Sequence, residues 1–429
     1  MKKINFKTLM VIFASAFFVA SCKPDIEVPT PDKGTADFTK YVAVGNSLTA
    51  GYADGGVYRD AQLNSYPALI AKQMKLAGGG EFIQPLYSEA QTNGTGYLKL
   101  KGLSATGVPN LAPEISQLGV IGLGADRRTP LYAKFTGANN NLGVPGIRVA
   151  DVLQAGYGLN NPLGFNPHFE RLLPDNSPKT YAQYAEESNP TFFSCWLGNN
   201  DVLGYATSGG TASITPDALF RNNFSDIMTR LTAKGAKGVT AYIPDVTVIP
   251  YLNTVTVAAA KLQVKALTGR DLDIFIRTGA GLVRRATNED LITLQADSLA
   301  TPNALGLPKG LDPRYPLNNE DVLDKDEVAT ASAAVLRFNA IIKEVADSKK
   351  VPVVDTYNYL NTFKGGRVVN GLSLNTGFIS GGLFSLDGVH LTPRGYAMTA
   401  NEFLKVINAS YNANLPLLDI SQYAGVTIK

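Results

Sequence analysis

Short apolar segments alternate with amphipathic ones along most of the chain. Apolar runs that end at Gly, Pro or Asp indicate buried strands over Tyr41–Val44, Phe192–Leu197, Gly238–Ile243 and Val351–Val354. Helical spacing predicts helices over Tyr66–Lys75, Asp217–Leu231, Glu327–Asp347 and Pro393–Ile407, the last with Pro in its first turn. Strands that alternate with helices predict an α/β protein, in which a parallel sheet is covered on both faces.

Two long stretches lack this alternation, around residues 55–140 and 250–326. We interpret them as insertions or elaborate loops, because structureless connections of this length are uncommon in a compact domain. Residues 38–429 have the length of either one large domain or two. We predict one α/β domain that carries both insertions.

The first residues have the pattern of a secretory signal. Three lysines precede or flank an almost wholly apolar run, Leu9 to Ala20, which ends at Ser21-Cys22. The run is well short of the ~20 apolar residues that cross a bilayer. A buried N-terminal helix is the alternative, but the abrupt polar change at Lys23-Pro24-Asp25 argues against it. We therefore predict a signal peptide over residues 1–21.

The end of this signal, Val19-Ala20-Ser21-Cys22, resembles the lipobox of bacterial lipoproteins. The resemblance implies that Cys22 is lipidated and becomes the new N-terminus, so that the protein is anchored to a membrane of the bacterial cell envelope, the outer membrane by the same resemblance. Acyl chains contribute ~0.8 kcal/mol per buried methylene to such an anchor. The alternative is a chance cysteine in an ordinary signal. Residues 22–37 are rich in Pro, Asp and Lys and predict a flexible tether.

Charge and residue counts exclude several classes of function. The chain has 39 basic and 36 acidic residues, and loss of residues 1–21 would remove three lysines and no acid. The mature protein is then near neutral, with no basic field to recruit nucleic acid. Beyond Cys22 only Cys195 is left, so no intramolecular disulfide forms in the mature chain. With two histidines and one mature cysteine, a zinc site built from His and Cys is excluded.

The scarcity of histidine narrows the search for a serine hydrolase site, which needs a hydroxyl on a tight turn, a histidine, an orienting carboxylate and oxyanion donors. His390 follows Asp387 by three residues, in SLDGVHLTPRGY, directly before a predicted helix. One short loop would thus present a base with its orienting carboxylate. His168 lies in FNPHFERLL without an adjacent motif, and we interpret it as a solvated or packed loop histidine.

Ser47 lies in GNSLT, directly after the first predicted strand. Its hydroxyl would stand at the carboxyl edge of the sheet, where active sites of parallel sheets lie. Its amide would lie at a turn or helix N-terminus, where backbone donors favour negative charge. The segment is not a GxSxG elbow, because Thr49 replaces the second glycine. This segment alone fits a nucleophile and a helix-capping serine equally well.

Four blocks taken together resemble the SGNH (GDSL-type) hydrolases, and they occur in the order of that family. They are AVGNSLTAGY, where the family usually has GDSL; NLGVPGIRVADVL, which matches N-x-x-x-x-G; WLGNND, which matches G-x-N-D; and DGVH. The resemblance covers the frame from about Tyr41 to Ile407, although the long connections are not accounted for. It implies a three-layer α/β/α, flavodoxin-like fold with a parallel central sheet and long inserted loops.

The resemblance also assigns roles to individual residues. Ser47 falls on the nucleophile, Asp387 and His390 on the acid and base, and Gly146 and Asn200 on the oxyanion-hole glycine and asparagine. The Ser47 and Gly146 amides and the Asn200 side chain would then hold the oxyanion, where losing one donor typically costs ~10²–10³ in rate. His390 would take the serine proton and return it to the leaving alkoxide, while Asp387 fixes the histidine tautomer.

One position departs from the family pattern: Asn46 stands where the family usually has Asp. Because this residue follows the strand and need not touch substrate, we expect the change to alter local hydrogen bonding more than chemistry. Other residues near the motifs have mainly structural interpretations. We expect Asn199 and Asp201 to shape the turn that carries Asn200, or to brace the site, Trp196 to be core, Arg148 to be a solvated helix residue, and Asp54–Gly56 to be a cleft-lining loop or a turn.

The sequence therefore predicts an exported, membrane-anchored serine esterase that needs no metal or organic cofactor. Its substrate would be a small-molecule, lipid or glycan ester, and the apolar insertions favour a lipase or general esterase. Two alternatives stay open: a carbohydrate O-acetyl esterase, and a surface lipoprotein that binds glycan or lipid without turnover. A single Trp argues weakly against a broad sugar-binding surface, although 19 Tyr could substitute.

Overall fold

The computed structural model describes residues 30–104, 109–296, 306 and 308–428. At its centre is a parallel sheet of five strands in the order β13-β8-β7-β1-β6. The strands are β1 (Tyr41–Gly45), β6 (Asn141–Gly143), β7 (Phe192–Trp196), β8 (Lys237–Ala241) and β13 (Val353–Val354). The central strands β1 and β7 are buried along their whole length, because their apolar side chains face helices on both sides of the sheet.

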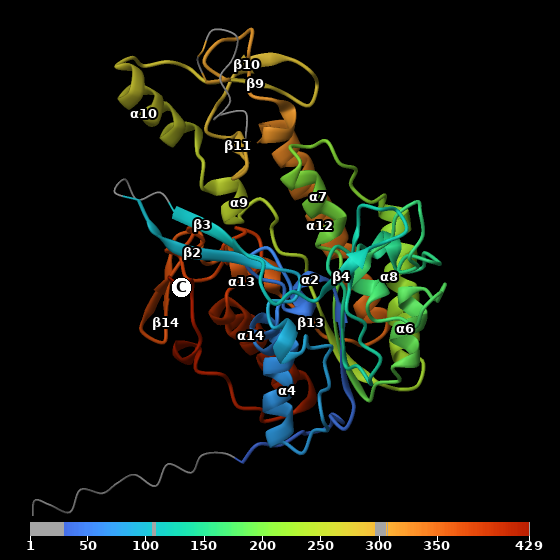
Figure 1. Ribbon diagram of the computed structural model, residues 1–429. Helices are drawn as coiled ribbons and strands as arrows, with labels where there is room; N and C mark the ends of the chain where they lie inside the picture. The colour runs from blue at the N-terminus through green and yellow to red at the C-terminus, as the bar shows by residue number, and fades with distance from the viewer. Residues whose placement is uncertain (1–29, 105–108, 297–305, 307, 429) are drawn as a thin grey trace, which may run out of the picture.

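Helices cover both faces of this sheet (Figure 1). On one face, α4 (Tyr66–Leu76) packs against α14 (Pro393–Tyr411). On the other, α8 (Asp217–Thr232) lies between α6 (Tyr181–Glu187) and α12 (Lys325–Ser348). The predicted three-layer α/β/α fold is confirmed.

Glycine lets the chain pack tightly at the carboxyl edge of the sheet. In the central strand, Gly45 is paired with Trp196 on one side and with Gly143 on the other. A Cβ on Gly143 would lie 2.2 Å from the Ala50 amide nitrogen, so only glycine allows α2 (Ser47–Ala50) to rest directly on β6. The segments that follow β1, β6 and β7 therefore leave the sheet side by side.

The strands and helices predicted from the hydrophobic pattern are all present, with boundaries shifted by a few residues. The pattern does not predict β6, because its three residues, Asn-Leu-Gly, have no apolar run. The remaining short elements lie in the connections: η3 (Val149–Asp151), α5 (Pro167–Glu170), α7 (Asn200–Thr207), α13 (Thr356–Asn361), β14 (Arg367–Val369), β15 (Leu372–Leu374) and η5 (Ile420–Gln422).

The predicted signal segment and Cys22 lie outside the described residues. The last part of the predicted tether is bound to the domain rather than free. Asp32 pairs with Asn414 through two backbone hydrogen bonds of 3.3 and 2.8 Å, and Ala36 is only 3% exposed. The packed domain therefore begins several residues before the predicted boundary at residue 38. No helix in the described part of the chain is long and apolar enough to cross a membrane.

The predicted insertion around residues 55–140 combines a core helix with surface hairpins. Its helix α4 belongs to a covering layer of the sheet. The rest consists of α3 (Arg59–Leu63), η2 (Glu89–Gln91), a hairpin of β2 (Tyr97–Leu103) and β3 (Pro109–Glu114), and a second hairpin of β4 (Val120–Leu123) and β5 (Pro130–Tyr132). This region is thus partly scaffold and only partly insertion.

The predicted insertion around residues 250–326 forms a small lobe at one end of the molecule (Figure 1). It contains α9 (Pro250–Asn253), α10 (Val257–Thr268), β9 (Phe275–Arg277), β10 (Val283–Arg285), β11 (Leu291–Ile292), η4 (Asn319–Asp321) and β12 (Val322–Leu323). The lobe has its own buried apolar cluster, which includes Val257, Ile276 and Ile292. It is therefore a packed unit and not a loop.

Candidate active site

Ser47 is the first residue of α2 and follows β1 after a single residue, Asn46. The Asn46 side-chain oxygen accepts a hydrogen bond from the Leu48 amide at 3.1 Å, which caps the short helix. Asn46 is 1% exposed, and its side-chain amide nitrogen has no partner within the described residues. An aspartate would make the same cap with a second acceptor in place of this donor, so the departure from the family pattern changes local hydrogen bonding.

A chain of hydrogen bonds joins three of the predicted catalytic residues across the length of the sequence. The Ser47 hydroxyl oxygen lies 2.8 Å from His390 Nε2, and His390 Nδ1 lies 2.8 Å from Asp387 Oδ2. With Nδ1 protonated toward the carboxylate, Nε2 is left as an acceptor for the serine proton. The geometry is that required for a serine activated by a histidine.

The Asp387 carboxylate is held in place by several donors. Oδ1 accepts from the Val389 and His390 amides at 2.9 and 2.8 Å and from the Ser385 hydroxyl at 3.2 Å. Oδ2 accepts from the Gly55 amide at 3.0 Å as well as from the histidine ring. Burial alone would raise the pKa of Asp387, but His390 and these hydrogen bonds hold it well below its usual value. The carboxylate therefore stays ionised and oriented.

The turn at residues 52–58 braces this acid, and it contains Asp54–Gly56, which the sequence left as either a cleft-lining loop or a simple turn. Asp54 has a φ of +53° and accepts a hydrogen bond from the Leu386 amide at 2.9 Å and another from the Tyr58 hydroxyl at 2.7 Å. The Asp54 amide donates to the Ser385 hydroxyl at 2.9 Å. The Tyr52 ring packs on the imidazole of His390, with centroids 4.4 Å apart. Both members of the Asp387–His390 pair are thus in contact with the segment that follows Ser47: Asp387 with the Gly55 amide and His390 with the Tyr52 ring.

Of the predicted oxyanion donors, Asn200 lines the same cavity as Ser47. Gly146 is exposed and has a φ of +81°, a backbone conformation that favours glycine. Within the described residues, neither the Ser47 nor the Gly146 amide has an acceptor in the protein. The Asn200 side-chain nitrogen donates to the Ile147 carbonyl at 2.9 Å, which leaves its second hydrogen for a ligand.

Two polar side chains that the sequence did not single out as catalytic hold the loop that carries Gly146. The Asp201 carboxylate, 1% exposed, accepts hydrogen bonds from the Val149 and Ala150 amides at 2.7 and 3.2 Å. Burial raises the pKa of Asp201 to about 6. From α8, the Asn223 side chain donates to the carbonyls of the same two residues at 3.0 and 3.1 Å. The expectation that Asp201 braces the site agrees with this arrangement, whereas nothing local to Asn223 signals its role.

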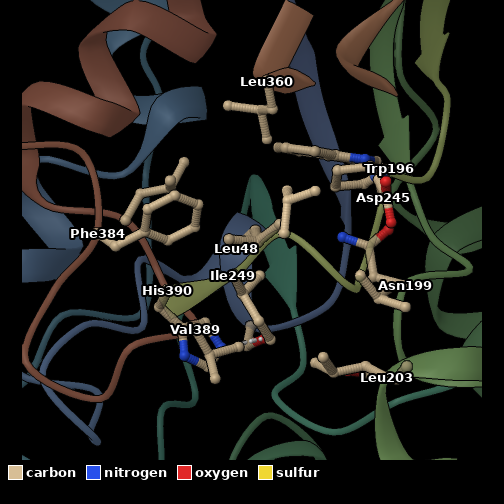
Figure 2. Close-up of a pocket in the computed structure, with 16 residues that line it drawn as sticks. Leu48, Trp196, Asn199, Leu203, Asp245, Ile249, Leu360, Phe384, Val389 and His390 are labelled. Atoms are coloured by element: carbon tan, nitrogen blue, oxygen red, sulfur yellow. Dashed lines mark hydrogen bonds between the residues drawn. The ribbon is translucent and has the colours of Figure 1, made fainter. Parts of the chain in front are cut away.

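A mostly apolar cavity opens beside Ser47 and His390 (Figure 2). In this view Phe384, Val389 and His390 lie on one side, and Trp196, Asn199 and Leu203 on the other. The cavity contains about 560 Å³ of empty space, its open mouth included. Its apolar lining consists of Leu48, Trp196, Leu203, Pro244, Val246, Val248, Ile249, Leu360, Phe384, Val389 and Leu391. The cavity could hold the apolar part of a bound molecule whose reacting carbon atom lies next to the Ser47 hydroxyl.

The other residues that the sequence singled out have structural surroundings. Trp196 is fully buried, and its indole nitrogen donates to the Tyr242 carbonyl at 3.0 Å, as expected for a core residue. Arg148 forms an ion pair with Asp151 at 2.7 Å at the start of η3. His168 packs against Tyr132, with ring centroids 5.0 Å apart, and takes no part in the chain of hydrogen bonds at Ser47.

Comparison with known proteins identifies the family. The model of the GDSL-like lipase/acylhydrolase family matches residues 41–403, so the chain belongs to this family. Its members are ester hydrolases, and this protein is accordingly an ester hydrolase of the α/β class. No curated protein matches the chain.

Solved structures with similar folds have low sequence identity. A lipase/acylhydrolase from Enterococcus faecalis is 13% identical, with 88% of this chain and 99% of the other covered and a TM-score of 0.34. An α/β hydrolase from the metagenome of Lake Arreo, Spain, is 12% identical, with 87% and 97% covered and a TM-score of 0.37. An acetylxylan esterase from Geobacillus stearothermophilus is 11% identical, with 87% and 95% covered and a TM-score of 0.36. Similarity at this level says nothing about the substrate.

Replacing Asp54 with alanine tests the brace at residues 52–58. The variant leaves the buried Leu386 amide and Tyr58 hydroxyl without their acceptor, so the free energy of unfolding should fall by about 1–3 kcal/mol. Turnover of a short ester should also fall, because the Asp387 loop loses its support. The exposed Asp60, six residues further on, is the matched control, and Asp60→Ala should stay within about 0.5 kcal/mol of wild type. Equal stability and turnover in the two variants would contradict the brace.

Proposed function

We propose that the protein cleaves carboxylic esters through an acyl-enzyme formed on Ser47. The observation that carries this proposal is the pair of 2.8 Å contacts that link the Ser47 hydroxyl to His390 and His390 to Asp387. The ionised Asp387 holds the imidazole with its Nε2 facing the hydroxyl, which is the arrangement that a serine nucleophile requires.

In the first half of the reaction, the Ser47 oxygen attacks the ester carbonyl carbon while its proton passes to His390 Nε2. The tetrahedral oxyanion accepts hydrogen bonds from the Ser47 and Gly146 amides and the free Asn200 N–H. The bond to the alcohol oxygen then breaks, and His390 gives its proton to that oxygen. In the second half, water attacks the acyl carbon, its proton passes to His390, and the acid leaves as the proton returns to Ser47.

The Ser47→Ala variant should lose the reaction while keeping the fold. Because this substitution removes only the side-chain hydroxyl group, we expect the rate of hydrolysis of a short-chain nitrophenyl ester to fall by about 10⁴-fold or more. Asn200→Ala should lower the rate by about 10²–10³-fold, since one oxyanion donor is lost. Release of nitrophenol measures the rate of each variant. If wild type and Ser47→Ala release it equally slowly, the proposal is wrong, and the alternative of a protein that binds glycan or lipid without turnover is favoured.

The apolar cavity indicates the substrate class. Eleven apolar side chains line it beside Ser47, so an apolar acyl chain would gain from burial there. The cavity has about 560 Å³ of empty space, its open mouth included, which limits the length of that chain. We therefore propose short to medium acyl esters as substrates. A carbohydrate O-acetyl esterase is the competing reading of the same site.

A series of nitrophenyl esters from acetate to palmitate tests the size of this cavity. Each buried methylene is worth about 0.8 kcal/mol, so kcat/KM should rise about fourfold per methylene until the cavity is full and then fall. Ile249→Ala enlarges the cavity and should move the optimum to longer chains. Leu262→Ala, on the exposed face of the separate lobe, should leave the series unchanged. An optimum at acetate in all three proteins would favour the O-acetyl esterase.

We further propose that the protein is exported and held at a bacterial envelope membrane, the outer membrane by family resemblance, through a lipid on Cys22. The basic residues, the apolar run and the Val-Ala-Ser-Cys sequence support this. Growth with labelled palmitate should label wild type and not Cys22→Ala. The other cysteine provides the control: Cys195 is fully buried in the core, so Cys195→Ala should keep the label. An unlabelled wild type would exclude the anchor.

A further inference from the structure

A second cavity lies behind the oxyanion loop, on the β6 side of the nucleophile. Its walls include Ala50 of the nucleophile helix α2 and Pro145, which directly precedes Gly146. Tyr87, His168 and Arg171 also line it. Its empty space is about 320 Å³, opening included, against about 560 Å³ for the cavity at Ser47, so it suits a small occupant such as a water molecule or a small ion.

Arg171 brings a positive charge into this cavity without a carboxylate to balance it. The side chain is 5% exposed, and no acidic group forms an ion pair with it within the described residues. Its terminal nitrogens donate to the Pro85 and Leu86 carbonyls at 2.8 and 3.3 Å. Its Nε has no acceptor. The neighbouring Glu170 is already paired with Lys134 at 2.5 Å. A buried cation left in this state carries a large desolvation cost.

Two further donors belong to residues that line the same space. The Tyr87 hydroxyl is fully buried and has no hydrogen-bond partner in the described part of the chain. The Tyr87 ring lies under the Arg171 guanidinium, with 4.1 Å from the guanidinium carbon to the ring centroid. Burial, together with Arg171, lowers the pKa of His168 to about 3, so the imidazole is neutral and keeps one N–H in either tautomer.

Donors therefore predominate in the lining, where the second ring nitrogen of the neutral His168 is an available acceptor. None of the described residues that line it is acidic. The two lining amides, Gln62 and Asn141, already use their side-chain oxygens to accept from the Tyr87 and Gly143 amides, both at 3.1 Å. A water molecule could direct its hydrogens to the His168 ring and the Tyr87 oxygen, but it would leave the charge of Arg171 unbalanced, whereas an anion balances that charge and accepts from the donors.

From this geometry we propose that the cavity is a binding site for a small monovalent anion of the size of chloride, held by Arg171 Nε and the Tyr87 hydroxyl. The ion would balance the buried guanidinium and lie against Pro145 and Ala50. It would thus stabilise the backbone that presents the Gly146 amide and Ser47. This inference does not rest on the proposed ester hydrolysis.

Bromide provides a direct test, because it resembles chloride and scatters anomalously. Crystals of the protein grown or soaked with sodium bromide should show an anomalous peak in this cavity, in contact with Arg171 Nε and the Tyr87 hydroxyl. In solution, sodium chloride or bromide should raise the melting temperature relative to sodium gluconate at equal ionic strength, since a ligand that binds only the folded protein stabilises it.

Tyr87→Phe removes one donor and keeps the ring under Arg171. It should weaken the apparent halide affinity, read from the melting temperature against halide concentration, by about tenfold. Tyr359→Phe, the same chemical change on α13 away from the cavity, should respond to halide like wild type. An ordered water without anomalous signal in the cavity, or an equal halide response in all three proteins, would overturn the proposal.

Discussion

The register of three parallel strands governs the rest of the site. Gly45 at the end of β1 is paired with both Trp196 and Gly143, so β1, β6 and β7 end at one edge of the sheet. The chain leaves this edge to form Ser47, the Gly146 loop and Asn200 within a few residues of each strand. A slip of one residue would turn each of these side chains to the opposite face. The close approach of Ala50 to Gly143 opposes such a slip, because a side chain at that position would collide with α2.

The fourth segment of the site comes from the far end of the chain and is fastened by polar contacts. The Asp387 carboxylate accepts a hydrogen bond from the Gly55 amide, and the Leu386 amide donates one to Asp54. The Gly388 carbonyl accepts from the Tyr251 amide of the inserted lobe at 2.9 Å. These bonds satisfy groups that are largely buried, which makes the loop costly to displace. The lobe is therefore tied to the catalytic loop as well as having a core of its own.

The sheet order also separates the two cavities near Ser47. The apolar cavity is lined by residues that follow β7 and β8 and by others from α2 and the C-terminal part of the chain, whereas the donor-lined cavity includes Asn141 and Gly143 of β6. Only the first is suited to an acyl chain, because burying apolar surface there involves few polar groups. The second contains an unbalanced guanidinium and unpaired donors, which favour a charged occupant. One edge of the sheet thus presents two chemically distinct spaces.

Local patterns in the sequence determined the main strands and helices and drew attention to Ser47 and to the Asp387–His390 pair. The resemblance to the SGNH hydrolases added Gly146 and Asn200 and assigned a role to each of the five residues. The alternation of apolar and polar residues and the Gly, Pro and Asp residues at turns extend over only a few positions, so both can be recognised in the sequence. Only the tertiary structure decided that β6 joins the sheet, that the 52–58 turn supports an acid 332 positions further on, and that Asn223 holds the Gly146 loop. These contacts join residues distant in sequence, and no local pattern of apolar and polar residues records such a pairing.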